Sequence, residues 1–157
     1  GEIPCEGYRL AGSGEVEAPL YYLTSVDPYS LSQCRGKIVL IEGYLGYWKY
    51  HDLVESGAVG FITFDGDANY RDSDMDKREL RKFVVEGANG VKLPGVNINA
   101  KSAIAMIKNK VRTVKLTLSQ EEYEGQSHNV ILDLPGEIPE TILFTAHYGS
   151  TPLSTGA

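Results

Sequence analysis

Hydrophobic side chains are most clearly patterned near the middle of the chain. Residues 37–41 form a short, β-branched apolar run between glycines, which is typical of a buried strand. Over residues 47–56 apolar side chains recur at helical spacing, and Gly57 supplies a C-terminal stop. A second apolar run follows at 59–64. This order predicts two neighbouring parallel strands joined by a helix.

The segments on either side of this unit add further elements. The apolar residues 19–23 indicate a strand, and the polar residues 25–33 indicate a loop. Asn99 is placed to cap a helix over residues 100–108. Apolar and polar side chains then alternate over 113–118, which is the pattern of a half-exposed strand. A compact α/β unit is complete at this point.

The last part of the chain has a different composition. A polar stretch at 120–125 precedes two strand-like apolar runs, 129–134 and 141–146, which a Pro-Gly turn region can join as a hairpin. Because a lone hairpin is marginal in water, it must pack on the first domain, on another copy or on residues outside this sequence. We therefore expect one domain at 1–118 and, at 119–157, a linker with the first strands of a truncated second domain. The hairpin edges predict a homodimer.

Composition and charge exclude several classes of protein. The formal net charge is −6 and the sequence pI is near 5.1, which is unsuited to binding a phosphate backbone, so no nucleic-acid partner is expected. No apolar run approaches the roughly 20 residues of a membrane-spanning helix, so no membrane span is expected. Cys5 and Cys34 can form one disulfide or none. We expect free thiols, and a cytoplasmic location ahead of a secreted or cell-surface one.

Aromatic residues gather around the start of the predicted helix, at Tyr44, Tyr47, Trp48 and Tyr50. Tyr and Trp offer contact area at a low cost in side-chain entropy, so a rim that binds a peptide or protein is one interpretation. Packing in the core or on the helix face is the other.

Three separated motifs in the first domain resemble one family. The sequences GKIVLI at 36–41, LVESGAVGFI at 53–62 and LPGV at 93–96 follow the order of motifs in protease-associated domains. The similarity spans about residues 11–118. It implies an α/β fold in which a small mixed sheet or open barrel is flanked by short helices. It also implies a non-catalytic role, in which the domain shapes substrate access to a peptidase or binds a peptide or protein.

Further motifs lie in the tail: SHNVI at 127–131, a Pro-Gly pair at 135–136, ILFTAHYGS at 142–150 and STGA at 154–157. Together they are similar to the start of the two-zinc aminopeptidases, metallopeptidase family twenty-eight. The predicted hairpin would then be the first part of a peptidase domain.

This second resemblance implies zinc chemistry in an intact parent protein. There, two zinc ions would activate water, and the enzyme would remove N-terminal residues from peptides. His147 matches the first zinc ligand of the family. One imidazole cannot hold a catalytic zinc ion, so we expect neither bound zinc nor catalysis from the 157 residues alone.

One position departs from the family pattern. Gly149 stands where the family carries an aspartate, which removes a carboxylate that supports the metal site. Two alternatives to a domain of an active enzyme therefore stay open. One is a domain of a catalytically inactive, receptor-like binding homologue, and the other is a stand-alone peptide-binding module.

Overall fold

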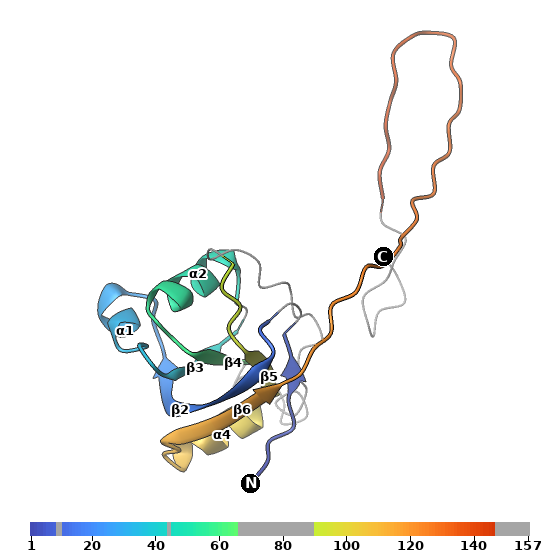
Figure 1. The fold of residues 1–157 in the computed structure, drawn as a ribbon. Helices are drawn as coiled ribbons and strands as arrows, with labels where there is room; N and C mark the ends of the chain where they lie inside the picture. The colour runs from blue at the N-terminus through green and yellow to red at the C-terminus, as the bar shows by residue number, and fades with distance from the viewer. Residues whose placement is uncertain (9–10, 44, 66–89, 147–157) are drawn as a thin grey trace. The chain divides into compact units, whose positions relative to one another are not determined.

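A curled, mixed sheet organises the first of two compact units, Gly1–Glu122 and Tyr123–Ala157 (Figure 1). The computed structural model describes the chain except for residues 9–10, 44, 66–89 and 147–157. The strands of the described sheet are β1 (Glu6–Gly7), β2 (Gly14–Leu23), β3 (Ile38–Glu42), β4 (Gly60–Asp65), β5 (Gly95–Asn99) and β6 (Thr113–Leu118). Their order is β1-β5-β4-β3-β2-β6, with β2, β3, β4 and β5 parallel and the two edge strands antiparallel. The predicted α/β fold with a mixed, open-barrel sheet is confirmed.

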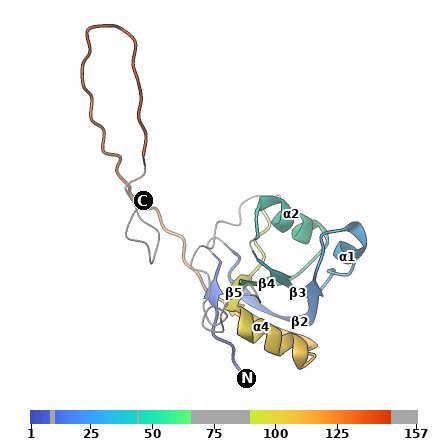
Figure 2. The same cartoon turned by 180° about the vertical axis from the view of Figure 1, so that it is seen from behind.

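Helices cover both faces of this sheet, as the two opposite views show (Figures 1 and 2). They are α1 (Pro28–Ser32) and α2 (Tyr47–Glu55) on one face and α4 (Ala100–Lys108) on the other. Side chains alternate along β3, so that Val39 and Ile41 pack in the core under α2 while Ile38 and Leu40 pack in the core under α4. The apolar run at the centre of the sequence is therefore buried on both sides.

Several local predictions are confirmed by the backbone. Strands β3 and β4 are parallel and α2 connects them in sequence. Gly57, with φ of 79°, follows the C-cap of α2 in the left-handed conformation that favours glycine. The Oδ1 atom of Asn99 accepts a hydrogen bond from the N–H of Ser102 (2.8 Å) and caps α4. In β6, Leu116 is buried and the alternate side chains are exposed, as the period of two predicts.

The predicted loop at 25–33 is wrong, because this segment contains α1. The carboxylate of Asp27 accepts hydrogen bonds from the N–H (3.0 Å) and hydroxyl (2.7 Å) of Ser30, and Pro28 occupies the first turn. The backbone hydrogen bond from Ser30 is the main reason that the pKa of Asp27 falls to about 2. Because this pKa is depressed, the cap contributes fully above the ordinary pKa of 3.8 and is lost as the pH falls through about 2.

The segment after β6 closes one end of the curled sheet. The Nε2 atom of Gln120 donates hydrogen bonds to the carbonyl oxygens of Tyr8 (2.8 Å) and Ala11 (3.2 Å). The N–H of Gln120 donates to the hydroxyl of Ser13 (2.9 Å), and that hydroxyl lies 3.2 Å from the carbonyl of Gln120. Gln120 therefore joins the end of β6 to the chain between β1 and β2.

We expect Gln120→Ala to lower the free energy of unfolding by about 1–2 kcal/mol, since it removes the donor that two part-buried carbonyls share. Urea denaturation followed by circular dichroism measures the change. Gln126→Ala, at an exposed position of the second unit, is the control and should stay within about 0.5 kcal/mol of the unmodified chain. Equal, small effects of both substitutions would show that the closure does not stabilise the fold.

The hairpin predicted for the tail is not formed in the described part of the second unit. Residues 123–146 contain no strand. Apolar side chains of the two predicted strands have exposed fractions of 77–90%: Val130, Ile131, Leu132, Leu134, Ile142, Leu143 and Phe144. The physical reason is that a two-stranded hairpin without a covered apolar face gains too little from burial to offset its ordering.

Two further properties concern the described residues only. None of their helices has the length and apolar character needed to cross a bilayer. Cys34 is buried, Cys5 is exposed, and no disulfide joins them.

Candidate functional site

The aromatic residues that lie close together in the sequence around the start of α2 differ in their burial in the structure. Tyr50 is 1% exposed, so for this residue the structure agrees with packing in the core, the second of the two interpretations. Its hydroxyl donates to the carbonyl of Val91 (2.6 Å) and accepts from the N–H of Leu93 (3.0 Å), and its ring meets that of Phe61 edge-on at 6.0 Å. Burial raises the pKa of Tyr50 above its ordinary value. Tyr50 therefore anchors the chain before β5 to α2, while Tyr44 lies outside the described residues.

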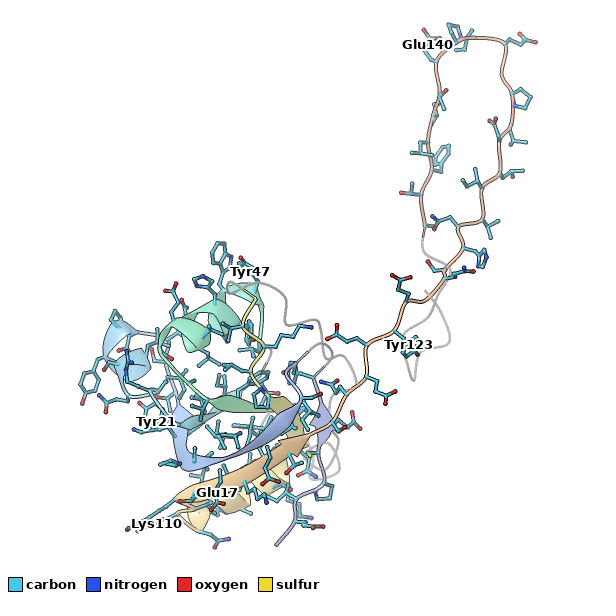
Figure 3. All side chains as sticks on the ribbon, in the orientation of Figure 1. Glu17, Tyr21, Tyr47, Lys110, Tyr123 and Glu140 are labelled. Atoms are coloured by element: carbon cyan, nitrogen blue, oxygen red, sulfur yellow. The ribbon has the colours of Figure 1, made fainter. Side chains whose placement is uncertain are left out.

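Tyr47 and Trp48 instead lie on the surface of α2, with exposed fractions of 53% and 77%. Figure 3 shows Tyr47 projecting outward from the helix. The rings of Tyr47 and Trp48 meet edge to face at 5.0 Å, and Tyr47 also stacks with His51 at 6.4 Å. The Nε2 atom of His51 lies 3.6 Å from a carboxylate oxygen of Glu55. The aromatic rings are thus held by one another, which lowers the entropic cost of binding through them.

A groove lies between α1 and the C-terminal part of α2. It has a volume of about 380 Å³. Its lining residues are Leu31, Ser32, Arg35, Asp52, Glu55 and Ser56. Tyr29 of α1 is also a largely exposed aromatic residue. We call Tyr47 and Trp48, with this groove to which their helix contributes, the aromatic face. It offers flat apolar contacts together with charged groups of both signs, a combination suited to binding a polypeptide.

The described residues do not assemble a metal centre. Among them, no three His, Cys, Asp or Glu side chains come together in a way that could hold a metal ion. His147, the sequence-predicted zinc ligand, and Gly149 both lie outside this part of the chain.

No protein-family model and no curated protein matches this sequence. Solved structures that share its architecture include two aminopeptidases. BSAP, a zinc aminopeptidase from Bacillus subtilis, has a TM-score of 0.53 and 20% sequence identity. The aminopeptidase from Aneurinibacillus sp. strain AM-1 has a TM-score of 0.50 and 16% identity. These similarities show the fold.

In both comparisons the match covers 73% of this chain but only 27% of the solved structure. The chain thus spans about a quarter of the length of proteins whose names describe aminopeptidases. The aromatic face belongs to the first compact unit, within which the strands and helices of the fold also lie.

Proposed function

We propose that this chain is a non-catalytic domain of a zinc aminopeptidase and that its aromatic face contacts peptide or protein substrates. The exposed cluster of Tyr47 and Trp48, on the helix that also contributes to a charged groove, carries the proposal. Surface Trp and Tyr residues dominate binding energy at protein interfaces. The likeness to two aminopeptidase structures, each much longer than this chain, supports a place beside a peptidase domain.

The finer assignment rests on the sequence motifs. We infer a protease-associated domain over residues 1–118 and the beginning of a family twenty-eight peptidase domain over 119–157. In the intact parent His147 would bind one of two zinc ions, with the other ligands supplied from outside this sequence. Bound zinc makes water nucleophilic near neutral pH. The parent would then remove N-terminal residues from peptides.

A second candidate is favoured by Gly149. Without the family's aspartate at this position, the parent would be a receptor-like homologue that binds its partner and does not cleave it. The aromatic face would serve the same purpose in that protein or in a stand-alone peptide-binding module. The enzyme domain differs from the other two candidates in that its parent would take up zinc and release amino acids.

The test is a comparison of two substrates in the parent protein. We expect Trp48→Ala to raise KM for a polypeptide substrate about tenfold, because a truncated aromatic anchor costs more than 1 kcal/mol of binding. The same substitution should leave kcat and KM for an aminoacyl-p-nitroanilide unchanged, since this small reporter does not reach the aromatic face. Tyr123→Ala removes an exposed aromatic residue of the second unit and serves as the control.

Other outcomes separate the alternatives. An equal loss of activity on both substrates would contradict a role in contacting polypeptides. A parent that binds polypeptides through Trp48 but takes up no zinc and releases no amino acid would favour the receptor-like homologue.

A further inference from the structure

The outer edge of β6 is open among the described strands, because β6 pairs with β2 on one side only. The N–H of Leu20 in β2 donates to the carbonyl of Arg112 (2.8 Å), which identifies Leu20 and Arg112 as a hydrogen-bonded pair. Such pairs alternate along an antiparallel ladder. At every second position of β6 after Arg112 the residue therefore forms a non-hydrogen-bonded pair with β2. These residues are Thr113, Lys115 and Thr117, and their N–H and C=O groups point away from β2.

The position of Pro19 agrees with this assignment. Pro19 lies opposite Thr113 in the register and has no N–H to donate to the ladder. The open edge of β6 thus presents three residues whose backbone groups are directed outward, spaced as an added strand requires.

A cavity lies directly against this edge. It has a volume of about 770 Å³, within the range of ligand-binding pockets. All residues from Thr113 to Thr117 line it, as expected when the edge of a strand faces the space. Its apolar wall comes from the sheet and from α4 and the turn after it: Ile62, Val96, Ile98, Met106 and Val111. The N-terminal residues Gly1, Glu2, Ile3 and Cys5 also line it. An apolar side chain from a strand added to β6 would be removed from water here.

The charge around this edge is locally positive although the chain as a whole is acidic. No aspartate or glutamate occurs between Gly87 and Gln120. Exposed basic residues of α4 and β6 and of the turn between them are Lys101, Lys108, Lys110, Arg112 and Lys115. Acidic side chains lie nearby on β2, where Glu15 contacts Lys115 (2.8 Å) and Glu17 lies opposite it in the register. Glu2 lines the cavity. The excess of positive charge is therefore at the turn, where Figure 3 labels Lys110.

We propose that an acidic, extended peptide adds as a strand to the open edge of β6. Its backbone would pair with Thr113, Lys115 and Thr117, an apolar side chain would enter the cavity, and its carboxylates would lie near the turn between α4 and β6. Strand addition derives affinity from backbone hydrogen bonds and specificity from pockets for alternate side chains. This surface is separate from the aromatic face, so the inference stands apart from the proposed function.

The experiment uses fluorescence polarisation with the full chain. The probe is a fluorescein-labelled hexapeptide in which glutamate alternates with valine and leucine, and its counterpart carries lysine in place of glutamate. Thr117→Pro removes an outward N–H without removing a β2–β6 hydrogen bond, and proline is tolerated on edge strands. Thr117→Val keeps the N–H and is the matched control. Thr113→Pro, at the first residue of β6 and opposite Pro19, is a second variant should Thr117→Pro not fold.

We expect saturable binding of the acidic peptide that weakens with salt, and weaker binding of the lysine peptide. The proline variant should bind the acidic peptide about tenfold less tightly, while Thr117→Val binds as the unmodified chain does. A folded proline variant with undiminished affinity would overturn the proposal, as would equal binding of the two peptides.

Two other occupants of the edge are also tested. The first is a second copy of the chain. It would be indicated if sedimentation of the chain without peptide revealed a dimer and Thr117→Pro abolished that dimer. Stronger binding of a fluorescein-labelled single-stranded oligonucleotide than of the acidic peptide would point to nucleic acid. Either result would overturn the assignment of an acidic peptide.

Discussion

Replacing Phe61 with alanine is expected to lower the free energy of unfolding by about 3–5 kcal/mol. Phe61 is fully buried in the core under α2, where its ring meets Tyr8 edge-on at 5.0 Å and Tyr50 at 6.0 Å. It also lies opposite Gly95 in the β4–β5 register. A Cβ atom on Gly95 would come within 1.9 Å of the Phe61 ring, so the ring fills the space that this glycine leaves.

Truncation of Phe61 would therefore leave a cavity bounded by the rings of Tyr8 and Tyr50 and by the backbone of Gly95. Gly95 has no side chain that could fill this cavity. Urea denaturation followed by circular dichroism gives the change in free energy. Phe144→Ala removes the same atoms from a largely exposed position and should change stability by less than about 0.5 kcal/mol. A cost below about 1 kcal/mol for Phe61→Ala would contradict the packing described for this core.

The second large effect is expected for Gly12→Ala, which should cost about 2–3 kcal/mol because of overpacking. The N–H of Gly12 donates to the carbonyl of Leu93 (3.0 Å), and this bond holds two backbone segments together. A Cβ atom on Gly12 would lie 2.1 Å from the carbonyl oxygen of Lys92. Because this obstacle is backbone, no side-chain rotation relieves it.

Thermal unfolding compares Gly12→Ala with Gly136→Ala, whose added Cβ would meet nothing within 4 Å. Hydrogen exchange provides a second readout, since parting of the two segments should speed exchange at the backbone N–H of residue 12. Unchanged stability and unchanged exchange in Gly12→Ala would show that the two segments are not in close contact.

Local patterns in the sequence are sufficient to predict most strands of the sheet. The β-branched run of β3, the alternation in β6 and the Asn99 cap each depend on neighbouring residues, and all three are present. The helix α1 was missed although Asp27-Pro28 is a recognised start signal, because only one turn follows it. The two-residue strand β1 has no period that could reveal it.

The candidate site was harder to predict, because it depends on contacts between distant residues. Tyr47 and Tyr50 both fit the apolar spacing of α2. Tyr50 is the buried one, and its contacts are with residues distant in the sequence: its ring packs on Phe61 and its hydroxyl bonds to Val91 and Leu93. The groove between α1 and α2 requires α1, a segment for which the sequence pattern predicts a loop. The open edge of β6 follows from the strand order, which no local pattern contains.

The burial of β3 on both sides has a consequence for which substitutions this domain can tolerate. Consecutive residues such as Ile38 and Val39 belong to different cores, and the sheet itself separates the two. Substitutions at distant sites without common partners combine almost additively in their effect on stability, and among the described residues Leu118 is packed against both cores. The surface next to α2 can therefore acquire new binding residues, and repack beneath them, while the packing around α4 is retained.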